Sequence, residues 1–166
     1  VGHAQATLLA EALSGRLDRI YSSPLSRAWQ TAQALGEPVV LSELVELDQG
    51  DLEGLDGPTA LERFRDFLEA WRRDPARLPV PGGESLEQCQ ARALSALDRV
   101  GESHADGQIV ALVSHQLVIS SLGCALAGEP LARWREHGVG NGSVTVLVRR
   151  SGRWERVVKG WVPPER

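Results

Sequence analysis

The stretch LVSHQLVISSLG, residues 112–123, is an apolar run that contains one histidine and one glutamine. The residues around its start, 108–114 (QIVALVS), form a nearly continuous β-branched and aliphatic segment, which is typical of a central strand buried on both faces. Residues 116–127 follow with a strongly apolar helical pattern that Gly128 ends. The sequence therefore predicts that His115 lies between the end of a buried strand and the start of a helix.

A strand-to-helix junction of this kind is a common place for a ligand. In open α/β sheets, ligands bind beyond the carboxyl ends of the strands. Helix N-termini at that edge present N–H groups and a positive dipole end, which favour an anion. Burial of a polar group without a partner costs a few kcal/mol, so the alternative is a core histidine that has found a protein partner. We favour a site residue for His115.

The rest of the chain alternates between helical and strand patterns. Helices are predicted over 3–14, over 24–35 with Ser23 as N-cap and Pro24 as first position, over 61–71, and over 86–100. The last of these follows a capping box of Ser85 and Gln88. Strands are predicted at 17–23 and 38–41, loops at 42–57 and 74–83, and a closing hairpin at 143–150 and 153–160. This order predicts an α/β fold, a three-layer α/β/α sandwich with a mixed central sheet and a C-terminal β-hairpin. No internal repeat or linker interrupts it, which predicts a single domain over 1–166.

Composition excludes several classes of function. The net charge of −4 and the lack of a basic stripe argue against a nucleic-acid partner. Lys159 is the sole lysine, which argues against a P-loop and a Schiff-base lysine. No apolar run reaches the roughly 18 residues of a membrane span, and no signal peptide is visible, so no membrane partner is expected. Cys89 and Cys124 fall inside apolar helical patterns, which predicts reduced, buried thiols and a cytoplasmic location.

A second predicted strand, IYSS, also ends at a helix start, and Arg27 lies in the first turn of that helix. The helix dipole disfavours a cation at this position, so Arg27 is expected to face something negative. A guanidinium offers a planar fork of donors that matches two phosphate oxygens. The alternative is a salt bridge to the acidic loop.

The predicted loop at 42–57 is strongly acidic. A carboxyl group near a bound phosphate can donate a proton to a leaving alcohol, whereas most surface carboxylates are simply solvated. The local sequence does not select one among the five candidates, Glu43, Glu46, Asp48, Asp51 and Glu53.

Four motifs in this order carry a resemblance to a known family. SSPLSRAWQTA (22–32), LVELDQGDLEGL (44–55), PGGES (81–85) and LVSHQLVISSL (112–122) are similar to segments of the histidine phosphatase superfamily, also called phosphoglycerate mutase-like. VGHAQATLLAEAL (1–13) resembles the helix near the start of that family's domain, so the resemblance runs from residue 1 to about 150. The short segment at 57–82 is similar to the compact phosphatase-type members rather than to the larger mutases.

The resemblance implies a role for each of four residues. Arg27 corresponds to an arginine that clamps phosphate, Glu46 to a general acid and base, and His115 to a histidine that binds the transferring phosphoryl group. Gln116 stands where its backbone N–H contacts phosphate. The implied activity is that of a metal-independent phosphomonoesterase that needs no cofactor and hydrolyses a small phosphorylated metabolite. The alternatives are a phosphoglycerate-type mutase and a catalytically dead member that binds a phosphorylated ligand or a partner protein.

One part of the family's pattern has no counterpart in residues 1–166. The resemblance implies an Arg-His-Gly stretch near the N-terminus, whose histidine attacks phosphorus and becomes phosphohistidine. His3, His104 and His137 stand outside that context and are expected to be ordinary surface or loop histidines. Because Val1 stands almost at the start of the first recognisable helix and methionine is absent, an N-terminally incomplete copy that lacks its first strand is favoured over a degenerate member. Such a chain is expected to be poorly stable, prone to aggregation and inactive as a phosphatase.

Two further enzyme classes fit the sequence poorly. GESHA (101–105) faintly resembles the nucleophile elbow of serine hydrolases, but that elbow follows a strand and precedes a helix, and here the order is reversed. No spacing typical of a zinc site or an EF-hand is present, so no metal is expected.

Overall fold

The computed structural model describes residues 2–164; Val1, with which the single domain was predicted to begin, and residues 165–166 lie outside the described part. The helices are α1 (Gly2–Leu13), α2 (Ser26–Leu35), α3 (Gly57–Arg63), α4 (Arg65–Arg73), α5 (Leu86–Glu102) and α6 (Gln116–Ala127). The strands are β1 (Arg19–Ser22), β2 (Pro38–Val40), β3 (Val110–Val113), β4 (Val144–Arg150) and β5 (Arg153–Trp161). Short 3₁₀ turns lie at η1 (Ser42–Leu44), η2 (Gly50–Leu52) and η3 (Leu131–His137).

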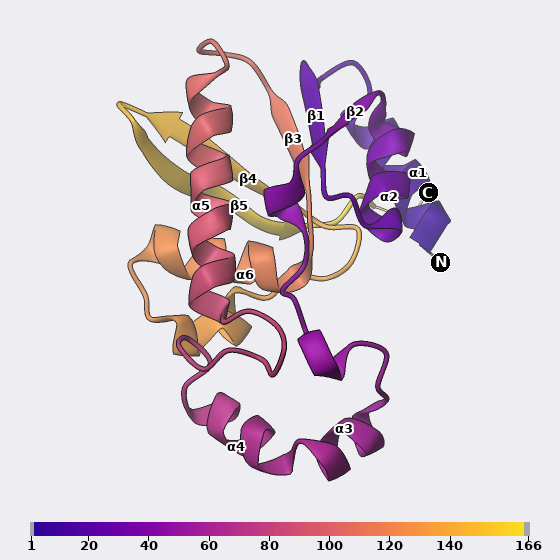
Figure 1. Cartoon of the computed structure of the whole chain (residues 1–166). Coiled ribbons are helices and arrows are strands. Elements are labelled where there is room, and N and C mark those ends of the chain that lie inside the picture. The colour runs from indigo at the N-terminus through magenta and orange to yellow at the C-terminus, as the bar shows by residue number, and fades with distance from the viewer. Residues whose placement is uncertain (1, 165–166) are drawn as a thin grey trace.

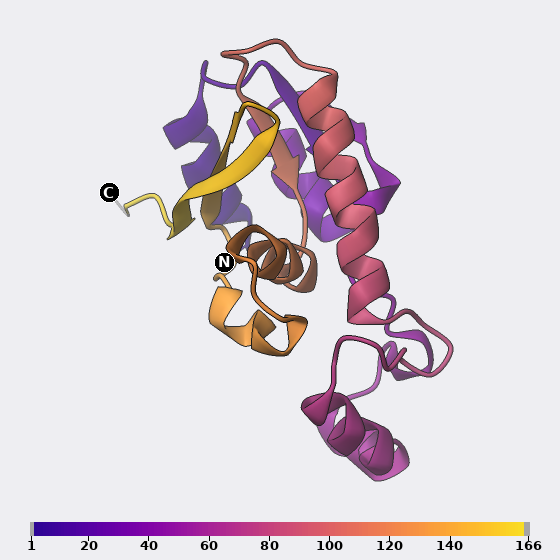
Figure 2. The same ribbon diagram turned by 90° about the vertical axis from the view of Figure 1, so that its left-hand side faces the viewer.

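Three of the strands form a parallel sheet in the order β2-β1-β3. Its register places Ser22, the last residue of β1, opposite both Val40 and Val113. Helices α1 and α5 lie on opposite sides of this sheet (Figure 2), and β4 and β5 form a separate antiparallel pair. The predicted α/β architecture with helices on both faces and a closing hairpin is confirmed, with its parallel and antiparallel parts divided between two sheets.

The position of β3 differs from the prediction of a fully buried central strand. Among the described strands, β3 pairs only with β1 and stands at the outer edge of the parallel sheet. All four of its residues are half-buried rather than buried. An apolar run indicates that a segment requires cover, but it does not specify which neighbours supply that cover.

Two local predictions were also wrong. Helix α2 begins at Ser26 after Leu25, and the hydroxyl of Ser23 does not cap it. Ser23 Oγ instead accepts the N–H of Leu25 at 3.2 Å and contacts His115. The helix predicted over 61–71 is divided into α3 and α4 at Phe64, whose backbone (φ −126°, ψ 28°) leaves the helical region.

Local chemistry explains the elements that were predicted correctly. The capping box is formed, because Ser85 Oγ accepts the N–H of Gln88 while the side chain of Gln88 accepts the N–H of Ser85. Helix α6 has the predicted bounds and ends at Gly128 in the left-handed conformation (φ 66°). The hairpin turns at Ser151 and Gly152, both with positive φ, as a two-residue turn requires.

The hydrophobic core lies mainly between α5, α6 and the loops at their ends. Its buried residues are Leu47, Val80, Leu86, Cys89, Ala93, Val118, Cys124 and Leu131. Helices α3 and α4 extend away from the sheet at the lower end of Figure 1, and Phe67 packs against the core from this arm. No helix between residues 2 and 164 is long and apolar enough to cross a membrane.

Candidate active site

The carboxyl ends of all three parallel strands deliver candidate residues to one edge of the sheet. Strand β1 leads into Ser23 and the helix that carries Arg27, β2 leads through η1 to Glu46, and β3 leads to His115. Cross-strand bonds hold these exits together: the N–H of Ser23 donates to the carbonyl of Val113 at 3.0 Å, and the N–H of Leu41 donates to the carbonyl of Ser22 at 2.9 Å. Parallel pairing is therefore what gathers segments that are 90 residues apart in the chain.

His115 is buried, with 6% of its surface exposed, and stands at the N-cap of α6. Its Nε2 shares a hydrogen bond of 2.7 Å with Ser23 Oγ. Burial, together with the positive charges of Arg27 and Arg92, lowers the pKa of His115 to about 4. The imidazole is therefore neutral at pH 7, and the positive charges of Arg27 and Arg92 favour a negatively charged ligand beside it.

Glu46 meets the same helix start. Its Oε1 accepts the N–H of Leu47 at 2.9 Å, and its Oε2 lies 3.4 Å from the backbone nitrogen of Leu117, in the first turn of α6. The neighbouring bond from Ser114 Oγ to the carbonyl of Leu44, 2.8 Å, ties η1 to the end of β3. The carboxyl of Glu46 and the imidazole of His115 thus both lie at the N-terminal end of α6.

Arg27 and Gln116 complete the predicted set. Arg27 is exposed in the first turn of α2, which follows the carboxyl end of β1, and its positive charge contributes to the lowered pKa of His115. Gln116 is the first residue of α6 and is exposed, so its backbone N–H lies at the helix start beside His115. The structure brings all four sequence-predicted site residues to one edge of the sheet.

The other histidines lie elsewhere. His104 follows the end of α5, where its Nδ1 contacts the carbonyl of Val100 at 2.8 Å, and His3 is exposed in α1. His137 corrects the expectation of a surface or loop histidine, because only 5% of its surface is exposed. It is held between Glu129, 2.9 Å from Nε2, and Arg156, 2.9 Å from Nδ1, so it ties η3 to the hairpin.

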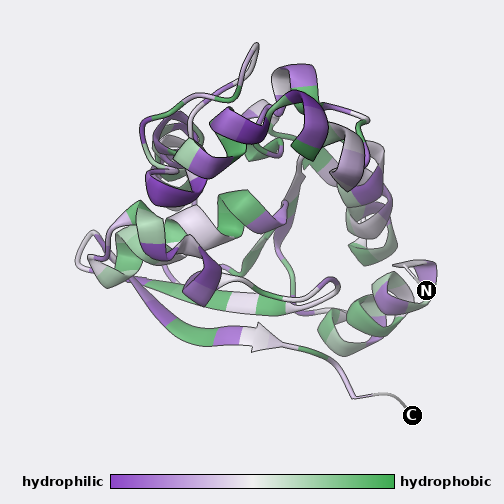
Figure 3. Cartoon of the chain, turned by 90° about the horizontal axis from the view of Figure 1, so that it is seen from below, coloured by the Kyte–Doolittle hydropathy of each residue, from purple (hydrophilic) through white to green (hydrophobic). Residues whose placement is uncertain are grey.

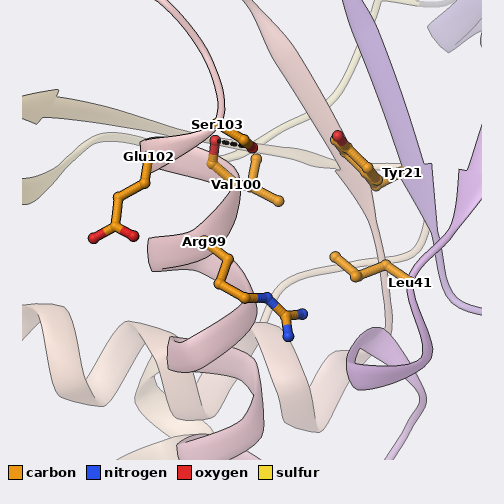
Figure 4. Close-up of a pocket in the computed structure, with 6 residues that line it drawn as sticks. All are labelled: Tyr21, Leu41, Arg99, Val100, Glu102 and Ser103. Atoms are coloured by element: carbon orange, nitrogen blue, oxygen red, sulfur yellow. Dashed lines mark hydrogen bonds between the residues drawn. The ribbon is translucent and has the colours of Figure 1, made fainter.

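An open hollow of about 450 Å³ lies away from these residues. It is lined by Tyr21, Leu41, Arg99, Val100, Glu102 and Ser103 (Figure 4). These residues come from the middle of β1, the chain after β2 and the C-terminal turns of α5, whereas the candidate catalytic groups lie at the carboxyl edge of the sheet. None of the four predicted site residues lines this hollow. Within residues 2–164, no group of three or more His, Cys, Asp or Glu side chains is arranged to hold a metal ion.

Comparison with known proteins identifies the family of the chain. The family profile described as the histidine phosphatase superfamily (branch 1) matches residues 1–161. The chain belongs to this superfamily. Phosphoserine phosphatase 1 of Hydrogenobacter thermophilus is 34% identical over 152 residues, which cover 88% of this chain and 72% of that protein. Glucosyl-3-phosphoglycerate phosphatase of Mycobacterium tuberculosis is 34% identical over 168 residues, 93% of this chain and 74% of that protein.

Solved structures give the same result for the fold of this histidine phosphatase. The complex of mycobacterial glucosyl-3-phosphoglycerate phosphatase with inorganic phosphate matches with a TM-score of 0.83 and 31% identity, and the match covers 97% of this chain and 86% of that chain. The resemblance stated from the motifs is therefore confirmed at the level of family and fold.

Sequence reasoning missed two members of the site's surroundings. Ser23 was interpreted as a helix cap, but it is the hydrogen-bond partner of His115. Arg92 was not singled out, although it lies in α5 beside the buried positions Cys89 and Ala93. A charged residue next to the apolar face of a helix is the signal that would have identified it, because a partly buried cation requires partners.

Proposed function

We propose that this histidine phosphatase is a phosphomonoesterase that hydrolyses a small phosphorylated metabolite through a phosphohistidine intermediate. The observation that carries the proposal is the convergence of Arg27, Glu46 and His115 at the carboxyl edge of one parallel sheet. The names of the relatives support the substrate class, since they act on phosphoserine and on glucosyl-3-phosphoglycerate.

Each residue has a distinct part in the proposed reaction. The guanidinium of Arg27 and the N–H of Gln116 hold phosphoryl oxygens, and His115 donates a hydrogen bond that stabilises their growing charge. A nucleophilic imidazole nitrogen attacks phosphorus while the ester P–O bond breaks, and Glu46 gives its proton to the leaving oxygen. Water then attacks phosphorus, its proton passes to the carboxylate of Glu46, and the P–N bond breaks to release inorganic phosphate.

We further propose that the nucleophilic histidine is carried by one more strand of the same domain, which pairs with the outer edge of β3. Three observations support this position: β3 has a partner on one side only among the described strands, its apolar residues are half-buried, and it ends at His115. An unpaired edge of this kind exposes ladder groups that normally find a partner. Sequencing the coding DNA upstream of the Val1 codon tests this, since we expect an in-frame strand that ends in Arg-His-Gly; an in-frame stop codon there would refute it.

Two substitutions in the complete protein test the roles at the site. Glu46→Gln should lower kcat for phosphoserine by roughly 10² to 10⁴-fold, because the leaving oxygen loses its proton donor. Arg27→Ala should chiefly raise KM, because the ground-state phosphate loses a charged partner. Full activity in both variants would contradict the assignment of these roles. Assays with phosphoserine, glucosyl-3-phosphoglycerate and 3-phosphoglycerate as substrates separate phosphatase activity from mutase activity.

A binding protein is the second candidate, because residues 1–166 contain no Arg-His-Gly stretch. This alternative predicts that the complete gene product binds inorganic phosphate at Arg27 and His115 and releases no phosphate from any monoester.

For location we propose the cytoplasm, which the two buried, unbridged cysteines Cys89 and Cys124 support. Cell fractionation of the native protein measures this directly.

A further inference from the structure

The guanidinium of Arg92, in the middle of α5, contacts the segment that carries Glu46. Its Nη1 donates to the carbonyls of Glu43 at 2.6 Å and Val45 at 2.7 Å, and its Nη2 donates to the carbonyl of Glu46 at 3.1 Å. Three backbone carbonyls within four residues therefore converge on one side chain. The segment has no regular secondary structure after η1 that would otherwise fix these carbonyls.

The remaining donors of Arg92 bind Glu84. Nε donates to Glu84 Oε2 at 3.1 Å and Nη2 to Glu84 Oε1 at 2.5 Å, with a longer contact from Nη2 to Cys89 Sγ at 3.3 Å. A guanidinium has five N–H donors in a rigid fork, and here all five have an acceptor. About 20% of the Arg92 side chain is exposed, so these bonds are formed largely out of water.

Glu84 holds the same segment from its other end. Its Oε1 accepts the N–H of Asp48 at 3.1 Å, and its own N–H donates to the carbonyl of Asp48 at 3.2 Å. Arg92 and Glu84 thus grip the chain on both sides of Glu46, by the carbonyls of 43, 45 and 46 and by both backbone groups of 48. The backbone is therefore held on both sides of Glu46: by Arg92 at residues 45 and 46, and by Glu84 at residue 48.

We propose that Arg92 is a positioning residue for the proton-donating carboxyl of Glu46, and that its effect depends on the planar fork of the guanidinium rather than on its charge. This inference rests on the role proposed above for Glu46. Lysine has three donors on one nitrogen and cannot bind two groups of acceptors in a plane. A displacement of about 1 Å at a reacting group can cost up to roughly 10²-fold in rate.

The test compares two substrates of the complete protein that differ in the leaving group. Phosphoserine releases an alkoxide, which requires a proton in the transition state, whereas 4-nitrophenyl phosphate releases a stable phenolate that requires none. Arg92→Lys keeps the charge and removes the fork. We expect kcat/KM for phosphoserine to fall by about 10-fold or more while kcat/KM for 4-nitrophenyl phosphate stays within about 2-fold. The ratio kcat/KM is the measure used because it reports the steps up to departure of the leaving group, before Glu46 accepts the proton of water.

Arg99→Lys is the matched control. Arg99 lies on the same helix and also pairs with the acidic segment, through Glu43 Oε1 at 2.5 Å, but it binds only a side chain and is 54% exposed. The Arg99→Lys substitution should leave kcat/KM for both substrates unchanged. An equal loss of kcat/KM on both substrates in Arg92→Lys, or no loss on either, overturns the inference. If Glu46→Gln itself shows no selectivity for the leaving group, it is the proposed role of Glu46 that fails.

A structural measurement keeps the two questions separate. In a crystal structure of Arg92→Lys we expect Glu46 Oε2 to move out of reach of the Leu117 nitrogen, which lies 3.4 Å away in the unaltered protein. An unchanged carboxyl position overturns the inference whatever the activity. If Arg92→Lys does not fold, Glu84→Gln is the second variant, because it weakens the bond to the fork and should give the same selective loss in smaller measure.

Discussion

At the scale of single residues, the site depends on a histidine that is kept neutral. His115 is enclosed by the β1 and β3 exits and lies near two arginines, and its pKa falls to about 4 for the combined reasons of burial and positive charge. Because the imidazole is neutral, the positive charge around it is carried by Arg27 and Arg92. A phosphate dianion would reverse this balance, because negative charge beside an imidazole favours its protonated form.

The same pKa makes stability depend on pH. His115 binds its proton at a pKa of about 4 when folded and near 6.5 when unfolded, so between these values the unfolded chain takes up a proton that the folded chain does not. The free energy of unfolding should therefore fall as the pH drops from 6.5 to 4, by at most roughly 3 kcal/mol from this residue, and should not change through it above that window. Urea titrations at several pH values measure the effect.

Two variants isolate the contribution of His115. His115→Gln should flatten the pH dependence of stability between pH 4 and 6.5 relative to the unaltered protein, because a group that titrates differently in the two states has been removed. His3→Gln, at an exposed position in α1, should run parallel to the unaltered protein. Parallel curves for His115→Gln as well would show that the imidazole titrates alike in both states.

At the scale of elements, the segment 43–50 is shaped by close backbone contact with the proline-glycine loop before α5. An added Cβ at Gly83 would lie 2.2 Å from the carbonyl oxygen of Asp48, and one at Gly50 would lie 2.2 Å from the carbonyl oxygen of Pro81. Real side chains do not approach so closely, so both positions require glycine. This contact allows Glu84 to reach the backbone of Asp48 and to complete its grip on the segment of Glu46.

Gly83→Ala should therefore destabilise the protein by about 1–3 kcal/mol, because the clash is with backbone and one of the two loops must move. Loss of activity should accompany it through displacement of Glu46. The matched control is Gly57→Ala at the start of α3, where an added Cβ meets nothing within 4 Å. Thermal unfolding of both variants decides the matter, and an unchanged midpoint for Gly83→Ala would contradict the proposed contact.

At the scale of the whole molecule, apolar surface and strand edges are left without cover in the described chain. Green segments lie along both hairpin strands (Figure 3), and Val146, Val157, Val158 and Trp161 of this hairpin are exposed. The outer edge of β3 adds a row of unpaired backbone groups, and exposed edges beside apolar surface favour association between chains.

We therefore expect the 166-residue chain, produced alone, to aggregate and to lack phosphatase activity. Size-exclusion chromatography and a phosphate-release assay measure both properties. The complete gene product is the control, and it should elute as a discrete species and release phosphate. A stable, monodisperse and active preparation of residues 1–166 would contradict the proposed additional strand and the nucleophilic histidine proposed to lie on it.

The sequence by itself determined the elements whose causes are local. Helix α6 and its glycine stop, the capping box of α5 and the hairpin turn at 151–152 follow from neighbours within four residues, so they could be predicted residue by residue. The motifs also predicted Arg27, Glu46, His115 and Gln116 as site residues, and all four lie on the segments that follow the carboxyl ends of the parallel strands.

Only the tertiary structure decided the features that depend on distant partners. The edge position of β3, the bond between Ser23 and His115, the burial of His137 and the convergence of three carbonyls on Arg92 all join segments that are 19 to 92 residues apart in the chain. Local patterns record whether a side chain prefers water or cover. They do not record which segment supplies that cover, because this is set by strand order and helix packing across the whole chain.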